Sequence, residues 1–264
     1  MVRATQKLVG LCALAICTVA SPALAGDCRL DSPAHRVTVI ELYTSEGCSS
    51  CPPADRWFSG LAKDGVSLQH AVLLAYHVDY WNSLGWPDRF SKPQFSDRQR
   101  AVATRNRASF VYTPQVVVDG RDFRRWRGGS LRATLAAINR QPARAAIRAD
   151  IQRTESAWRV QGEAVLTERT GRDRTQAWIA VFENGLSTQV KAGENAGARL
   201  EHDRVVRQLA GPFPLGTDGR VTLDQRITPA PDWNIERLGI AVFVERIDSG
   251  EVLEAVAKYP VCDA

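Results

Sequence analysis

Two cysteines separated by two residues lie at the point where a predicted strand gives way to a predicted helix. Residues 37–43 are rich in β-branched side chains and alternate in polarity, which predicts a buried strand. Pro52 and Pro53 lack the backbone N–H, which only the first turn of a helix can spare. Apolar side chains then recur at helical spacing, so we expect a helix that begins near Cys51 and leaves Cys48 just outside it.

A cysteine in this position is expected to be reactive. A thiol at Cys48 would face free N–H groups and the positive end of the helix dipole, both of which favour the thiolate. Ser49 and Ser50 add no positive charge and Glu46 would oppose a thiolate, so we expect the pKa of Cys48 to be lowered only moderately. The predicted mechanism has Cys48 attack a partner and Cys51 resolve the mixed disulfide, in a moderate or reducing couple.

The chain after this helix is predicted to alternate between strands and helices. In order, the pattern predicts a buried strand over 71–78, a helix from about 96 to 108, a hairpin over 115–127 and a helix over 131–138. Ser96, with Gln99 three residues later, is expected to cap the second helix. The pair Asp119-Gly120 favours the turn of the hairpin.

This order of elements resembles the thioredoxin fold. Cys48 and Cys51 match its active-site motif, and Thr113-Pro114 matches the cis-proline turn that faces the motif in that superfamily. The resemblance covers residues 35–141 and implies an α/β thioredoxin-like domain with a redox-active cysteine pair. Thr113 and Pro114 would then bind the cysteine-bearing segment of a partner by strand-like pairing.

A second stretch narrows the resemblance. Residues 77–81, His-Val-Asp-Tyr-Trp, and residues 84–86, Leu-Gly-Trp, resemble a bacterial family of secreted thioredoxin-like proteins that has no assigned function. This narrower resemblance extends over the rest of the chain and implies fold and chemistry, but no substrate.

The first 25 residues are predicted to be a signal peptide. Arg3 and Lys7 precede an apolar run over 8–20, and small residues end the segment at Ala25. We therefore expect an exported protein, periplasmic or secreted, and no membrane-spanning segment, because the run is short. Without Arg3 and Lys7 the chain has 32 basic and 29 acidic residues, a balance that does not indicate nucleic-acid binding.

Beyond residue 142 the pattern changes to short alternating runs separated by turn residues. These runs lie at 147–151, 158–166, 177–182, 221–227, 238–244 and 253–259. Short strands at such spacing are typical of a β-sandwich. The predicted organisation is a signal peptide over 1–25, a thioredoxin-like domain over 26–142 and an all-β sandwich-like domain over 143–264.

Four cysteines would remain after removal of the signal peptide, and an even number suits disulfides in an exported protein. Cys28 and Cys262 flank the two predicted domains, and we expect them to form a structural disulfide. Such a bridge would close a long loop and contribute about 5 kcal/mol in the chain-entropy model. It requires Cα atoms within about 7 Å of each other.

Glu41 lies within the first predicted strand, where an isolated charge would be costly. Thioredoxins carry a buried acid there that shuttles protons, six positions before the first cysteine, whereas Glu41 stands seven positions before Cys48. Because side chains alternate along a strand, this difference could place Glu41 on the opposite face. A proton relay and a plain ion-paired or edge carboxylate therefore remain alternative interpretations of Glu41.

His77 ends the second predicted strand near the motif. Together with Cys48 and Cys51 it would complete a Cys₂His set suited to copper(I), and a histidine that caps the strand is the alternative interpretation. The later stretches Asn195-x-Gly197 and His202-Asp203 are typical of turns, and we assign them no catalytic role.

Three functions follow as hypotheses. The favoured one is thiol–disulfide exchange with an extracytoplasmic protein partner, without a cofactor. The alternatives are copper binding or delivery through the cysteine pair and His77, and a non-catalytic binding module whose cysteines form an unreactive bridge. The exchange hypothesis requires that the two sulfurs be reachable and that Pro114 lie near them.

Overall fold

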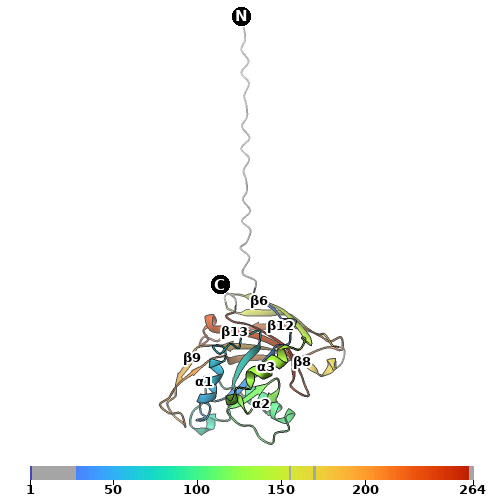
Figure 1. Ribbon diagram of the computed structural model, residues 1–264. Coiled ribbons are helices and arrows are strands. Elements are labelled where there is room, and N and C mark those ends of the chain that lie inside the picture. The colour runs from blue at the N-terminus through green and yellow to red at the C-terminus, as the bar shows by residue number, and fades with distance from the viewer. Residues whose placement is uncertain (2–27, 155, 169–170, 262–264) are drawn as a thin grey trace.

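The computed structural model describes residues 1, 28–154, 156–168 and 171–261 of the chain (Figure 1). Apart from Met1, the predicted signal peptide over 1–25 lies outside the described residues. The helices are α1 (Pro52–Gly60), α2 (Pro93–Arg105) and α3 (Leu131–Asn139), with single 3₁₀ turns η1 (Asn82–Leu84), η2 (Trp126–Gly128), η3 (Arg172–Arg174) and η4 (Ile235–Arg237). The strands are β1 (Arg29–Asp31), β2 (Thr38–Thr44), β3 (Ala71–His77), β4 (Gln115–Val118), β5 (Arg121–Asp122), β6 (Ala145–Arg153), β7 (Trp158–Leu166), β8 (Thr175–Glu183), β9 (Leu186–Gln189), β10 (Arg199–His202), β11 (Val205–Pro214), β12 (Arg220–Ile227), β13 (Leu238–Arg246) and β14 (Val252–Lys258).

The described strands form sheets of eight, four and two strands. The large sheet has the order β14-β13-β8-β11-β3-β2-β4-β5, and the smaller ones have the orders β1-β6-β7-β12 and β10-β9. Within the large sheet β11 pairs in parallel with β3, where Val205 lies opposite Ala75. Strands from both sides of residue 142 therefore share one sheet. The boundary at 142 stays a prediction, and the expected mixed α/β, β-rich fold is confirmed.

Helices cover both faces of the half of the large sheet that contains β3, β2, β4 and β5. Ile40 and Leu42 of β2 pack with α1 and α3, whereas Val39 and Tyr43 of the same strand pack with α2. This alternation follows from the two-residue period of a strand, and it explains why every residue of β2 is buried.

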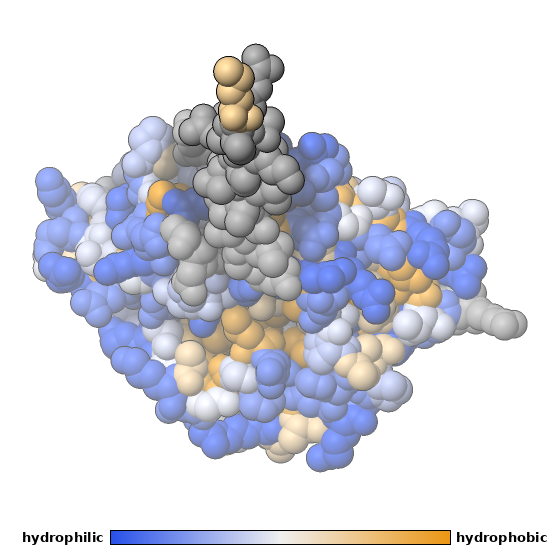
Figure 2. All heavy atoms as spheres, turned by 90° about the horizontal axis from the view of Figure 1, so that it is seen from above, coloured by the Kyte–Doolittle hydropathy of each residue, from blue (hydrophilic) through white to orange (hydrophobic). Residues whose placement is uncertain are grey.

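The four-stranded sheet packs against the other half of the large sheet, which contains β14, β13, β8 and β11. Their shared core contains alternate residues of β6 and β7, such as Ile147 and Val160, together with Ile179 of β8 and Val242 of β13. In Figure 1 this region, with β6 and β12, lies above the helices. The surface seen from that side in Figure 2 is mostly hydrophilic, with hydrophobic side chains gathered in its middle.

Two local expectations are corrected. Helix α2 begins at Pro93 and not at Ser96, because proline at the first helical position needs no N–H partner. The Ser96 hydroxyl bonds Asp79 instead, accepting from its N–H at 3.1 Å. The hairpin turns at Asp119-Gly120 as expected, but its returning strand β5 is only two residues long.

Candidate functional site

The cysteine pair lies at the N-terminus of α1, as the two prolines predict. Cys51 is the N-cap residue, and its carbonyl accepts the N–H groups of Ala54 at 2.8 Å and Asp55 at 3.1 Å. Cys48 lies one turn before the helix and forms a disulfide with Cys51, with 5.5 Å between their Cα atoms. The next two residues in the loop, Ser49 and Ser50, are exposed.

The turn before β4 lies against this pair. The Thr113–Pro114 peptide bond is cis, as expected. The Ser50 hydroxyl lies 3.3 Å from the sulfur of Cys48 and donates to the Thr113 carbonyl at 3.5 Å. The Trp81 indole N–H donates to the Thr113 hydroxyl at 2.8 Å. The structure therefore brings the cysteine pair and the Thr113-Pro114 turn together, while their roles stay predictions.

Both sulfurs are shielded, contrary to what the exchange hypothesis requires. Cys48 and Cys51 are each 0% exposed. Across the segment that carries Cys48 lie residues 190–198, between β9 and β10, which the sequence interpretation left without a role and which we call the cap loop. A partner cannot reach the disulfide in this conformation.

The cap loop is fastened to the cysteine segment by side chains. The amide of Asn195 donates to the carbonyls of Glu46 at 2.8 Å and Cys48 at 3.0 Å. The Glu194 carboxylate accepts the N–H of Ser49 at 3.0 Å. The side chain of Ser49, together with this N–H, lowers the pKa of Glu194. Gly193 has φ +74°, and a Cβ there would lie 3.1 Å from the Cβ of Trp86. Glycine is therefore required for this close approach.

Ionisable side chains are buried beside α1 and the segment that precedes Cys48, and we call them the buried polar cluster. Its members are Glu46, Asp55, His77, Asp88 and His202, each no more than 6% exposed. Nδ1 of His77 lies 2.6 Å from Asp88, and Nε2 of His202 lies 3.4 Å from Glu46. The two imidazole rings pack edge to face with 5.0 Å between their centroids. His202 thus ties β10, which follows the cap loop, to the strand that carries His77.

Burial and ion pairing compete within this cluster. Burial opposes the charge of His77, but the Asp88 carboxylate outweighs it and raises the pKa of His77. Burial likewise opposes the charge of Asp88, and His77 outweighs it and lowers the pKa of Asp88. For Asp55 burial prevails and raises the pKa. For Glu46 the nearby imidazole of His202 helps to overcome burial, and the pKa is lowered.

Glu41 lies on the face of the sheet away from α1. Its carboxylate accepts from Nε of Arg98, on α2, at 2.6 Å, and Arg98 also binds Glu245 at 2.9 Å. The structure therefore favours the ion-paired interpretation over the proton relay. The acid on the α1 side is Asp55, whose carboxylate accepts the hydroxyl proton of Thr44 at 3.2 Å. In the sequence, Asp55 could have been recognised as the acid near the cysteines because it lies in the first helical turn after Cys51.

The alternative copper ligands do not form a metal site in the described part of the chain. No group of three or more His, Cys, Asp or Glu side chains lies together there in an arrangement that could hold a metal ion. The two cysteines are joined as a disulfide, whereas a metal binds thiolates. His77 is bonded to Asp88 and does not cap its strand through the backbone.

Two remaining expectations concern the ends of the chain and the membrane. Cys28 precedes β1 and packs against the core of the two sheets, but Cys262 lies outside the described residues, so their bridge stays a prediction. None of the helices in the described residues is long and apolar enough to cross a bilayer.

Comparisons with solved structures show similar folds. Protein AGR_C_4864 from Agrobacterium tumefaciens is 24% identical, with 85% of this chain and 95% of that chain covered and a TM-score of 0.60. HBP35 of Porphyromonas gingivalis is 13% identical, with 86% of this chain and 76% of that chain covered and a TM-score of 0.64. At these identities the likeness concerns the fold alone. Among curated proteins none matches the chain.

The family assignment corrects the resemblance drawn from the motifs. The sequence model that matches is that of the family described as "Protein of unknown function (DUF1223)", and not a thioredoxin family. The match covers residues 39–245, from β2 to β13, and so runs through both predicted domains. The chain therefore belongs to the DUF1223 family of proteins of unknown function.

Proposed function

We propose that this protein is an exported thiol–disulfide oxidoreductase that exchanges disulfides with a protein partner through Cys48 and Cys51. The observation that carries the proposal is the position of the disulfide. It lies at the N-terminus of α1, where the positive end of the helix dipole favours a thiolate, and beside the carbonyl of Thr113. In the same proposal the sandwich-like β half, residues 143–264, provides the cap loop and docking surface.

The small size of the bridged loop supports a reactive role over a structural one. A disulfide between residues three positions apart restricts the unfolded chain little, about 2 kcal/mol in the chain-entropy model. The cover over it is also a surface loop, fastened to the cysteine segment by hydrogen bonds from Asn195 and Glu194. Such loops open at a small fraction of the free energy of global unfolding.

Exchange begins when the cap loop is displaced. A thiolate of the partner attacks the sulfur of Cys48, the Cys48–Cys51 bond breaks, and its electron pair leaves with Cys51 as a thiolate. A second thiolate of the partner then attacks the partner sulfur of the mixed disulfide and expels Cys48 as a thiolate. The partner loses two electrons, and the cysteine pair gains them. The reverse sequence reduces a disulfide of the partner.

A non-catalytic binding module is the second candidate, and the complete burial of both cysteines favours it. In that case the disulfide would be reduced only when the protein unfolds. Copper delivery has no supporting contact among the described residues. Stoichiometric copper(I) binding by the reduced protein that is lost in His77→Ala would favour it.

Trapping tests the proposal. In the compartment where the protein resides, Cys51→Ala should accumulate mixed disulfides through Cys48, because the resolving sulfur is missing. The adducts should disappear with dithiothreitol and be absent from the Cys48→Ser/Cys51→Ala control. Cys48→Ser should also abolish the reduction of insulin disulfides. Full activity of Cys48→Ser would overturn the proposed mechanism. No insulin reduction by the unmodified protein, together with an absence of adducts in Cys51→Ala, would leave the binding module.

A further inference from the structure

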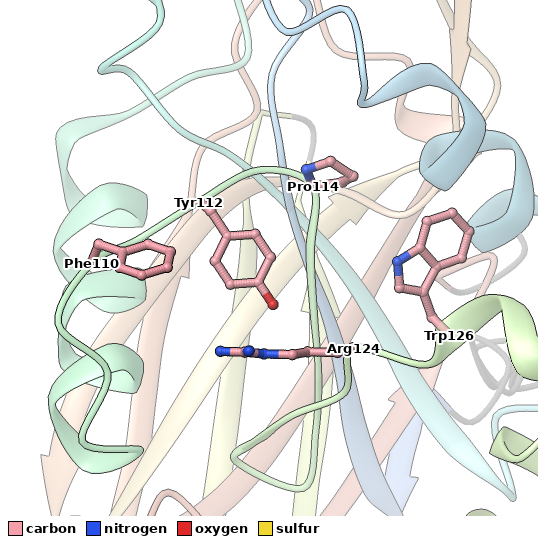
Figure 3. Close-up of a pocket in the computed structure, with 5 residues that line it drawn as sticks. All are labelled: Phe110, Tyr112, Pro114, Arg124 and Trp126. Carbon is pink, nitrogen blue, oxygen red and sulfur yellow. The ribbon is translucent and has the colours of Figure 1, made fainter.

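A cavity of about 290 Å³ lies beside the Thr113-Pro114 turn (Figure 3). Its walls are Phe110, Tyr112, Pro114, Arg124 and Trp126. In Figure 3 the rings of Tyr112 and Trp126 stand on opposite sides, with Pro114 above and Arg124 below. Ligand pockets span roughly 300–1,000 Å³, so this cavity suits one or two amino-acid side chains more than a cofactor.

The cavity adjoins the cysteine site. Pro114 lines it, and the neighbouring Thr113 carbonyl accepts from Ser50, which touches Cys48. On its other side the Trp126 ring packs against Trp57 of α1, with 5.1 Å between the ring centroids. A segment that pairs with the backbone at Thr113 would therefore place a side chain in this cavity.

The chain segment that supplies Arg124 and Trp126 to the cavity is rich in arginine. Four arginines lie within seven residues, at positions 121, 124, 125 and 127. The acid in that stretch, Asp122, is already satisfied by Tyr112 at 2.7 Å and Arg124 at 2.9 Å. The other three arginines are exposed, and none has a carboxylate partner among the described residues. Carboxylates of a ligand would therefore find unpaired guanidinium groups here.

The walls of the cavity favour an aromatic or large aliphatic side chain. Phe110 is 64% exposed, which is unusual for so large an apolar side chain beside other aromatic rings. The guanidinium of Arg124 lies 6.0 Å from the centre of the Tyr112 ring, so a ligand ring could contact both aromatic and cationic groups.

We propose that this cavity recognises an extended segment of the partner protein in which an aromatic or large aliphatic residue is flanked by carboxylates. The segment lies close to the partner's cysteine, so the inference rests on the proposed exchange function. It narrows the substrates to proteins with acidic segments around a cysteine. The binding itself does not require the exchange reaction, so the two can be tested separately.

The test uses a fluorescein-labelled peptide in which Phe is flanked by Glu and Ser replaces the nearby cysteine. We expect binding by anisotropy that weakens at high salt and that is lost when Lys replaces Glu or Gly replaces Phe. The Arg121→Glu/Arg125→Glu variant should bind about tenfold more weakly. Phe110→Ala should also weaken binding, and because Phe110 is exposed the fold should persist. Arg226→Glu, a charge reversal at an exposed position on β12, is the control away from the cavity and should bind normally.

Each outcome separates the two proposals. Binding as described, with no trapped adducts in Cys51→Ala, would keep the recognition site and remove the exchange function. Trapped adducts with equal binding of the Glu and Lys peptides, or unchanged binding by both cavity variants, would remove the recognition site alone. Equal affinity for an oligonucleotide or for anionic vesicles would show a nonspecific basic surface and would also overturn it.

Discussion

The strongest test of the cap loop is the substitution Asn195→Ala. The Asn195 amide makes two hydrogen bonds across the closed site, to the carbonyls of Glu46 and Cys48. A hydrogen bond of this kind contributes about 0.5–1.5 kcal/mol net, so closure should lose about 1–3 kcal/mol. Because the freed carbonyls can bind water when the loop opens, we expect the lower half of that range. The population of open molecules should then rise about tenfold.

The assay is the rate at which a small dithiol reduces the Cys48–Cys51 disulfide. Samples taken over time in dithiothreitol are alkylated, and mass spectrometry gives the fraction with two modified cysteines. If opening is rapid and precedes the reaction, the rate is proportional to the open population. Asn195→Ala should therefore be reduced about tenfold faster than the unmodified protein under conditions where both remain folded.

Asn139→Ala is the matched control. Asn139, at the end of α3, also donates its amide to two carbonyls, those of Arg36 at 2.8 Å and His70 at 3.0 Å. The loss of these two hydrogen bonds should lower the free energy of unfolding by about as much as Asn195→Ala weakens closure, and it should leave the cap loop unchanged. Equal acceleration in both variants would mean that reduction proceeds through unfolding, as expected of a structural bridge. An unchanged rate in Asn195→Ala would show that the loop is not the barrier.

Two further predictions concern the buried charges. Glu41→Gln removes the charge of one of the two carboxylates that bind Arg98, so it should lower the free energy of unfolding in urea by about 3 kcal/mol. The rate at which dithiothreitol reduces the disulfide of the folded protein should stay the same. Slower thiol–disulfide exchange in this variant would restore the proton-relay interpretation. Because Asp88 raises the pKa of His77, the stability contributed by this pair is fully present below about pH 6.5 and is lost as the pH rises through the folded pKa. The difference in unfolding free energy between the unmodified protein and His77→Gln should therefore shrink as the pH rises above about 6.5, and a constant difference would contradict this assignment.

The sequence predicts the parts of the site that depend on local rules. The prolines after Cys51 locate the start of α1, and the alternation of residues 37–43 locates β2. The same alternation assigns Glu41 to one of the two faces of β2, but it does not tell which face α1 covers. Only the contact with Arg98 decides this.

The parts that were missed depend on contacts between distant segments. Asn195 reaches Cys48 across 147 positions, and nothing in its own neighbourhood distinguishes it from an ordinary turn residue. Strand β11, which carries the chain back to β3, was also missed. Its pairing with β8 is interrupted by two register shifts, and Gly211-Pro212 breaks its alternation. A strand with bulges does not show the two-residue period on which sequence interpretation depends.

The pairing of β11 with β3 has a consequence for how this protein can be handled. A fragment that stops at residue 142 would lack β11, which meets β3 where Val205 lies opposite Ala75 and where the Arg204 carbonyl accepts the Ala75 N–H at 2.8 Å. That edge of β3 would then be uncovered. Every residue of β3 is buried in the intact protein, so the fragment would present an apolar open edge, and such edges associate with other chains. Attempts to produce the cysteine half by itself should give aggregates, and a workable protein for biochemistry must include β11 and the strands that pair with it.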